Sequence, residues 1–140
     1  MNIDNILLDK LTAQAKESPR LRMNLDLRNS AEDSSQRMLN AIEPGSMVPI
    51  HRHQKTSETV VVLRGSAVQW LYDNAGTVVD KVLLRAGDCQ VADGSCNGVP
   101  AMNVEIGQWH RIEALESGTV ILEMKDGAYE PIQECDILRS

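Results

Sequence analysis

The sequence predicts an all-β fold, an antiparallel sandwich or barrel, preceded by one α-helix. The chain has 140 residues, 42% hydrophobic and 24% charged, which is long enough for one buried core and ordinary in composition. After the first twenty residues, short apolar runs alternate with glycine-centred turns at the spacing typical of antiparallel β-proteins. We therefore expect a single domain over residues 1–140, with the helix at about 4–18 and the barrel at about 36–125.

The helix is predicted from a start signal, an apolar spacing and a stop signal. Asp4 is a favourable N-cap residue, and Leu7, Leu11 and Ala15 recur at helical spacing after it. Pro19 ends the pattern, because the residue before a proline is pushed out of the helical conformation. We expect the apolar stripe of this helix to pack on the body of the domain.

Six apolar runs are predicted to be strands, and each ends at a turn signal. A hairpin is indicated where Asp73-Asn74-Ala75-Gly76 separates two of these runs. Two segments lack such a pattern and are expected to be loops, at 29–36 and 89–103. The predicted strands cover residues 37–42, 59–63, 67–72, 78–84, 111–115 and 119–124.

Charge, aromatic content and cysteine usage restrict the classes of function. A net charge of −6 gives no electrostatic support for nucleic-acid binding, and two Trp, two Tyr and no Phe leave few rings for base stacking. The chain shows neither a signal-peptide pattern at its start nor a stretch of about 20 apolar residues. We expect a cytoplasmic protein without nucleic-acid or membrane partners. Cys89, Cys96 and Cys135 are expected to be free thiols, with a Cys89–Cys96 bridge as the alternative.

The histidines indicate a metal site. His51 and His53 lie in a segment expected to be extended, where a spacing of two puts both rings on one face, about 7 Å apart along the chain. Glu58 follows after four residues, far enough for the chain to bend back, and His110 begins a later strand. A His-x-His pair alone is more often structural. Together, imidazole and carboxylate predict one divalent transition metal ion, which could be Fe, Mn, Zn, Ni, Co or Cu.

The frame Gly45-x5-His51-x-His53-x4-Glu58-x6-Gly65 resembles the first motif of the cupin superfamily at every position. The second cupin motif is matched by Gly107-x2-His110, although Glu105 stands where proline is usual and Ala114 where asparagine is usual. The resemblance implies a small antiparallel β-barrel or double-sheet jelly roll that forms a homodimer. It also implies that the metal ligands are His51, His53, Glu58 and His110.

Most of the chain, up to Pro131, is similar to the WbuC-type family of cupin-fold metalloproteins. That family often accompanies surface-polysaccharide biosynthesis, and its reaction is not established. The resemblance therefore implies the fold and the metal but not the chemistry. Three imidazoles and one carboxylate leave one or two positions open on a five- or six-coordinate metal, so the first hypothesis is a metal-dependent enzyme acting on a small polar ligand such as a sugar or sugar-nucleotide derivative. The alternatives are a metal-dependent binding or sensing protein and a barrel with a structural metal. The residues that carry the resemblance are Gln36-Arg37, Glu43-Pro44-Gly45, His51-Arg52-His53, Trp109-His110, Ala114-Leu115-Glu116-x-Gly118-Thr119 and Lys125-x-Gly127-x-Tyr129-x-Pro131.

Three further features could contribute polar groups to the site, each with an ordinary alternative. Arg37 is either an anion clamp or part of a surface ion pair. Glu123 interrupts an apolar run and shares strand parity with Ile121, so it is either a base behind the site or a solvent-facing carboxylate. Gln69 and Tyr72 lie on opposite faces of one predicted strand, so at most one of them points inward.

Overall fold

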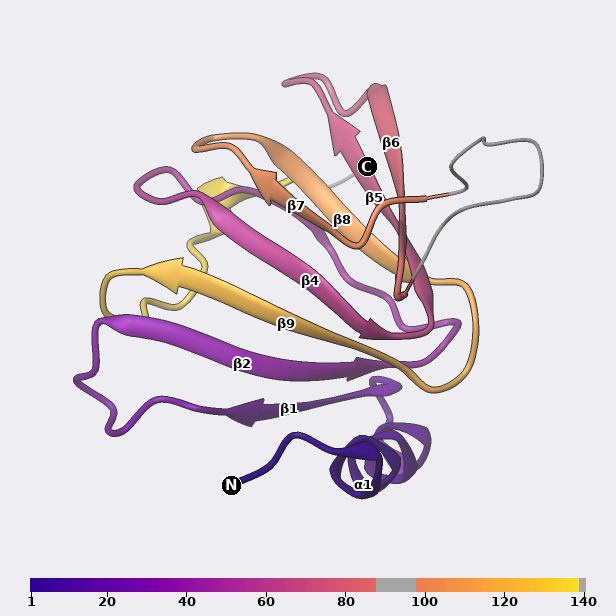
Figure 1. The fold of residues 1–140 in the computed structure, drawn as a ribbon. Helices are drawn as coiled ribbons and strands as arrows, with labels where there is room; N and C mark the ends of the chain where they lie inside the picture. The colour runs from indigo at the N-terminus through magenta and orange to yellow at the C-terminus, as the bar shows by residue number, and fades with distance from the viewer. Residues whose placement is uncertain (88–97, 139–140) are drawn as a thin grey trace.

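The structure of the protein, a computed structural model, describes residues 1–87 and 98–138. Within these residues, two antiparallel five-stranded sheets face each other (Figure 1). The first sheet contains, in spatial order, β1 (Arg22–Asp26), β2 (Ser35–Ile42), β9 (Thr119–Asp126), β4 (Glu58–Arg64) and β7 (Ala101–Val104). The second contains β10 (Ile137–Leu138), β3 (Ile50–His51), β8 (Trp109–Ala114), β5 (Ser66–Tyr72) and β6 (Val78–Arg85). The arrangement is a double-sheet jelly roll, and it confirms the predicted fold class.

Helix α1 (Asn5–Glu17) lies on the outer face of the first sheet, beside β1 and β2 (Figure 1). Its start is fixed by Asp4, whose Oδ1 accepts a hydrogen bond from the Leu7 backbone amide at 3.0 Å. The predicted N-cap and helix are therefore confirmed. The apolar stripe and the sheet face beneath it form one buried cluster of Leu8, Leu11, Ala15, Leu39, Ala41 and Val120.

The alternation of side chains along β2 separates the two apolar layers of the molecule. Leu39 and Ala41 point toward α1, whereas Ile42 points into the space between the sheets. Every strand of the first sheet can therefore offer one face to the helix side and the other to the second sheet. The core between the sheets consists of Ile42, Val60, Val62, Ala67, Leu84, Ile112, Ala114 and Ile121.

The sheets extend beyond the predicted barrel limits of about 36–125. β1 precedes that range and contributes Met23 and Leu25 to the layer beneath the helix. β10 is only two residues long and follows that range. Of the predicted 89–103 loop, residues 101–103 belong to the edge strand β7, which continues to Val104. Residues 89–97, and with them Cys89 and Cys96, lie outside the described residues, while Cys135 is an exposed free thiol.

Gly65 closes the turn between β4 and β5 and is required there for two reasons. Its φ of +83° lies in the left-handed region that side chains disfavour. A Cβ at this position would lie 2.8 Å from the Cα of Thr119 and would also clash with its hydroxyl. The last glycine of the first cupin motif therefore keeps the β4–β5 turn tight against β9.

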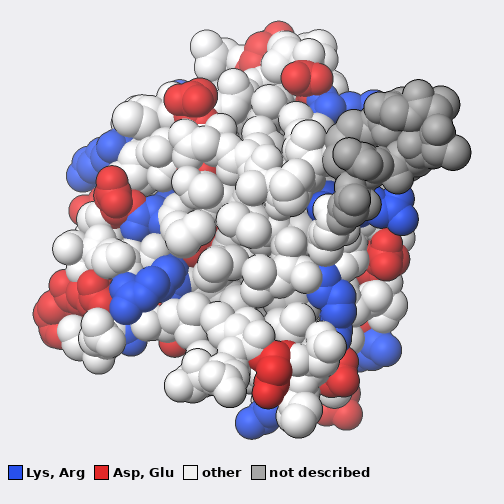
Figure 2. Space-filling view, in the orientation of Figure 1, with Lys and Arg blue, Asp and Glu red and all other residues white. Residues whose placement is uncertain are grey.

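The surface carries charges of both signs. Figure 2 shows lysine, arginine and carboxylate side chains spread around the edges of the visible face, with uncharged residues at its centre. In the part of the chain that the structure describes, no helix has the length and apolar character needed to cross a bilayer.

Candidate metal centre

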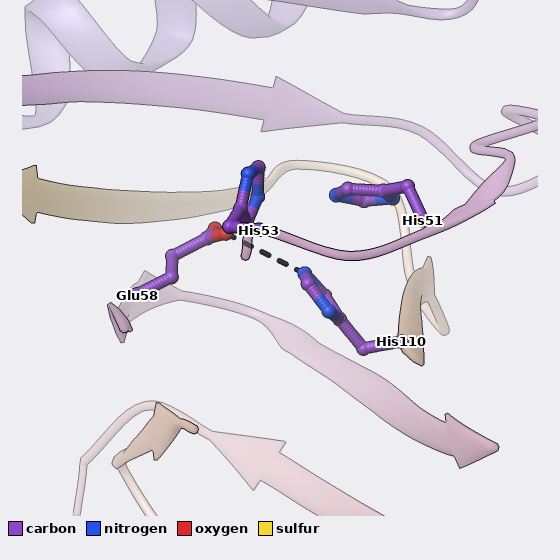
Figure 3. Close-up of side chains that lie close together, drawn as sticks. All are labelled: His51, His53, Glu58 and His110. Carbon is purple, nitrogen blue, oxygen red and sulfur yellow. Dashed lines mark ion pairs between the residues drawn. The ribbon is translucent and has the colours of Figure 1, made fainter. Parts of the chain in front are cut away.

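The four side chains predicted to bind metal meet where β4 begins, although they come from separate elements. His51 ends β3, His110 is the second residue of β8, and Glu58 is the first residue of β4. His51 and His110 are directly paired in the β3–β8 register. His51, His53, Glu58 and His110 each offer one ligand atom, and these four atoms all lie within 4.8 Å of one another. Figure 3 shows the rings and the carboxylate pointing toward one another.

His53 reaches the cluster by a different route from the predicted one. β3 ends at His51, so the two rings are not stacked along one strand face but meet edge to face, with centroids 5.1 Å apart. The backbone of His53 is held by the turn before β8, where the Gly107 amide donates to the His53 carbonyl at 2.8 Å. Gly107 has a φ of +78°, in the left-handed region, which a glycine adopts without strain.

Two of the imidazoles are held in the tautomer that a metal requires. Nδ1 of His51 lies 2.8 Å from the carbonyl oxygen of Pro49, and Nδ1 of His110 lies 2.8 Å from that of Gln108. A carbonyl can only accept, so each Nδ1 carries the proton and each Nε2 keeps its lone pair. Nε2 of His110 is buried, lies 3.5 Å from Oε2 of Glu58 and makes no hydrogen bond to any of the described residues. A buried, unpartnered lone pair is what an incoming metal ion would use.

Glu58 supplies the negative charge of the cluster. Its Oε2 lies 2.9 Å from Nε2 of His53 and 3.5 Å from Nε2 of His110. Burial alone would raise the pKa of Glu58, but the neighbouring imidazoles of His110 and His53 outweigh burial and hold that pKa well below its usual range. Glu58 is therefore a carboxylate at neutral pH.

His51 is uncharged at neutral pH. Burial, with a smaller contribution from the neighbouring His110, lowers the pKa of His51 to about 4. Only a neutral imidazole can coordinate a metal, so His51 is in its binding form without any further change. Three nitrogen donors and one carboxylate oxygen suit one divalent transition metal ion and do not specify which one.

The C-terminal segment braces the metal centre from outside. β10 pairs with β3, and the short 3-10 helix η1 (Glu134–Asp136) precedes it. Asp136 binds Arg52 at 3.0 Å between Oδ1 and Nε, and Arg52 lies over the Trp109 ring at 4.5 Å from the centroid. These contacts fix the chain between His51 and His53 to the strand that carries His110.

The structure shows which of the polar residues Gln69, Tyr72 and Arg37 points between the sheets. Gln69 points between the sheets, is 1% exposed, and its Nε2 has no hydrogen-bond partner. Tyr72 lies on the opposite face of β5. Arg37 is the surface alternative, since it pairs with Asp33 at 3.3 Å.

Glu123 points inward rather than to solvent. It pairs with Val60 in the β4–β9 register and therefore shares the inner face with that buried residue. Burial, and next the charge of Glu58, raise the pKa of Glu123 to about 8, despite opposing contributions that include a hydrogen bond from Asn40. Glu123 is thus a protonated, uncharged acid at neutral pH, on the same inner face as the metal centre.

A cleft of about 670 Å³ opens beside His53. Its walls come from the segment after His53, the end of β9 and the C-terminal segment. Lys125 lines this cleft, and in the sequence it is marked only as part of the closing segment that resembles the WbuC-type family. The cleft provides space for a small molecule next to one ligand of the metal centre.

Solved structures with this fold are cupins. KdgF from Halomonas sp. matches with a TM-score of 0.58 and 14% identity over 81% of this chain and 85% of KdgF. Oxalate oxidase in complex with glycolate matches with a TM-score of 0.62 and 14% identity over 84% of this chain and 56% of the oxidase. Oxalate decarboxylase from Bacillus subtilis, described with Mn(II) centres, has a TM-score of 0.55 and 19% identity, with 84% of this chain and 27% of the decarboxylase covered. The chain thus has the cupin fold and spans only part of the two oxalate enzymes.

The chain therefore combines the cupin fold with a histidine–glutamate cluster that can hold one divalent transition metal ion. Residues 3–84 match the model of DUF6016, a domain of unknown function. The match extends over more than half of the chain, so the protein belongs to this family. It includes His51, His53 and Glu58 but ends before His110. No curated protein matches the sequence.

Proposed function

We propose that the protein is a metal-dependent enzyme that acts on a small polar metabolite. In this proposal His51, His53, Glu58 and His110 hold one divalent transition metal ion. The observation that carries the proposal is the convergence of four ligand atoms within 4.8 Å of one another, among which the buried Nε2 of His110 makes no hydrogen bond to any described residue. When bound, such a metal supplies a Lewis acid for a carbonyl or hydroxyl oxygen of the substrate.

The residues of the chain provide the other functions that such an enzyme needs. The Pro49 and Gln108 carbonyls orient two imidazoles, and Glu58 keeps the site negatively charged before metal binds. Glu123 holds a proton on its buried carboxyl at neutral pH and is placed to give it to a substrate oxygen or to hydrogen-bond that oxygen. The buried amide of Gln69 adds an unpartnered donor between the sheets.

The second candidate is a metal-dependent protein that binds or senses such a metabolite without turnover. It is favoured by the cleft beside His53. Two cations that line this cleft, Arg52 and Lys55, form ion pairs with Asp136 and Glu130 and give the cleft a polar surface. A purely structural metal is the third alternative: four protein ligands close a tetrahedral ion, whereas they leave positions free on a five- or six-coordinate ion. The similarity to an oxalate oxidase in complex with glycolate and to an oxalate decarboxylase formate complex supports a small polar ligand.

The proposal also includes four more specific assignments. The WbuC-type resemblance and a role in surface-polysaccharide biosynthesis rest on the sequence motifs alone. A single domain over residues 1–140 and a homodimer are proposed with them. Ile6 on α1 is 80% exposed and Ile3 before it is 43% exposed, which provides apolar surface for a second copy. Light scattering should then give twice the monomer mass for the wild type, and the mass of a single monomer for the Ile6→Glu variant.

The open coordination position is the feature to test. Protein loaded with Mn²⁺ should strongly enhance water proton relaxation, because a water on the metal exchanges with solvent. A His110→Ala variant should lose the protein-bound enhancement together with the metal. A closed ion that gives no enhancement in the wild type would contradict both the enzyme and the binding protein. Conversion of a sugar or sugar nucleotide, followed by proton NMR, favours the enzyme, whereas binding without conversion favours the second candidate.

A further inference from the structure

Lys125 lies at the mouth of the metal centre. In the β4–β9 register it is directly opposite Glu58, and in the β2–β9 register it is opposite Gln36. Directly paired residues of antiparallel strands point to the same face of the sheet. The next pairs in the β4–β9 register are Val60 with Glu123 and Val62 with Ile121, which lead into the core between the sheets. Lys125 therefore lies on the inner face of β9, at the opposite end of the strand from the core residue Ile121.

Two clefts meet at this lysine. The cleft beside His53, of about 670 Å³, and a second one of about 280 Å³ are both lined by Lys125. The ammonium group is carried on a flexible stem of four carbons, so it can reach a ligand in the larger cleft while its backbone stays in β9. A molecule that approaches His53 through that cleft passes Lys125.

The other cations that line the two clefts already have carboxylate partners. Those pairs are Arg37–Asp33 at 3.3 Å, Arg52–Asp136 at 3.0 Å and Lys55–Glu130 at 3.4 Å. Among residues 1–87 and 98–138, no carboxylate oxygen lies within ion-pair distance of Lys125. Its positive charge is therefore available to an anion in the cleft.

Glu123 is the carboxyl nearest to Lys125 along β9 on the same face, and it does not cancel that charge. Lys125 acts on Glu123 only through space and would lower its pKa. Burial and the charge of Glu58 outweigh this effect and raise the pKa of Glu123 to about 8. At neutral pH the inner face thus presents the Lys125 cation opposite the Glu58 carboxylate of the metal centre, and behind them the neutral hydrogen-bonding acid Glu123.

We propose that the metal centre takes a small organic acid, and that Lys125 binds the carboxylate of this ligand. The inference rests on the proposed function and narrows its substrate class from polar metabolites to carboxylates, acidic sugars included. One ammonium group suits a singly charged carboxylate, whereas phosphate sites generally combine several donors such as guanidinium forks and backbone amides.

The test compares a carboxylate probe with its neutral counterpart. Wild-type protein is loaded with Mn²⁺, and glycolate, glycolamide and inorganic phosphate are each titrated while water proton relaxation is followed. We expect glycolate to bind more tightly than glycolamide or phosphate. Lys125→Gln should weaken glycolate binding roughly tenfold, the scale of one partly buried charge-assisted contact, and leave glycolamide binding unchanged.

Two matched variants and one assay make the result unambiguous. Lys55→Gln removes the same charge from the same cleft and should leave glycolate binding unchanged, while Lys125→Arg should restore most of the affinity lost in Lys125→Gln. Metal content of every variant is measured by elemental analysis. Equal glycolate affinity in wild type and Lys125→Gln, or tighter phosphate binding, would overturn this inference alone. A wild type that binds no metal would instead overturn the proposed function, and this inference with it.

Discussion

The two halves of the space between the sheets are lined by the same strands but differ in chemistry. In β4 the inward residues run from Glu58 to Val62, and in β9 from Lys125 to Ile121. At one end of these strands the inward side chains include the buried apolar residues Val62 and Ile121. At the other end the inward side chains are ionisable, and the predicted metal ligand His110 belongs to that end.

The two halves have different roles: the apolar half stabilises the fold, and the polar half holds the side chains of the metal centre. The apolar half gains free energy from every buried side chain. His110 in the polar half, and Asn40 and Gln69 beside the apolar core, carry buried polar atoms that make no hydrogen bond to any described residue: Nε2 of His110, Oδ1 of Asn40 and Nε2 of Gln69. Such groups lower the stability of the empty protein, and a bound metal or ligand would offset that cost.

The largest expected effect is on stability in the apolar half. Ile121 is fully buried between the sheets, so Ile121→Ala should lower the free energy of unfolding by about 3–4 kcal/mol, because it removes apolar contacts and leaves a cavity. The matched change in the polar half is His53→Ala, which should cost less than about 1 kcal/mol in metal-free protein but abolish tight metal binding. Chemical denaturation with and without metal measures both. Similar losses of stability in the two variants would remove the distinction between the halves.

A second contrast compares the glycines at the two ends. Gly65 lies at the apolar end, and Gly65→Ala should cost about 2–3 kcal/mol, because the added Cβ meets the backbone of Thr119 at 2.8 Å. Gly107 precedes His110 and also has a positive φ, but a Cβ there meets nothing within 4 Å. Gly107→Ala should therefore cost only about 1 kcal/mol of backbone strain. Thermal unfolding should rank the two variants in this order, and the reverse ranking would contradict the packing described at Gly65.

The smallest expected effect depends on pH. Because the pKa of Glu123 is raised to about 8 in the folded protein, the folded state binds its proton more tightly than the unfolded state. Its contribution is favourable at low pH and is lost as pH rises from about 4.5 through 8. In metal-free protein, Glu123→Gln should therefore gain about 2 kcal/mol relative to wild type between pH 6.5 and 8.5.

That pH range isolates Glu123 from the two other shifted groups nearby. His51, with a pKa lowered to about 4, changes stability between about pH 4 and 6.5, where acidification favours the unfolded state. Glu58, with a lowered pKa, acts only below about pH 4.5. A constant difference between wild type and Glu123→Gln from pH 6.5 to 8.5 would show that Glu123 is ionised throughout and faces solvent.

The sequence predicted the parts of this molecule that depend on spacing along the chain. The cap at Asp4, the six main strands and the convergence of His51, His53, Glu58 and His110 follow from periodicity and from one fixed motif. The inward direction of Glu123 was one of two stated alternatives, since strand parity links it to Ile121 without saying which face is buried.

Features set by contacts between distant strands could not be predicted in this way. The position of Lys125 opposite Glu58 depends on the β4–β9 register, which no local pattern encodes. β10 is two residues long, too short for any periodic signal. β1 alternates Met23 and Leu25 with polar residues, a signal that could have identified it despite its five-residue length. The raised pKa of Glu123 likewise depends on burial that only the folded molecule creates.

Metal content, measured by elemental analysis on untagged protein, tests the central claim most directly. The proposed site predicts one equivalent of a divalent transition metal in wild type, retained in Cys135→Ser, whose exposed thiol lies outside the cluster. The double variant His51→Ala/His110→Ala should lose at least nine-tenths of that metal, since it removes two of four ligands. A wild type without metal even after reconstitution, or equal metal in all three proteins, would contradict the claim that this end of the jelly roll is a metal centre.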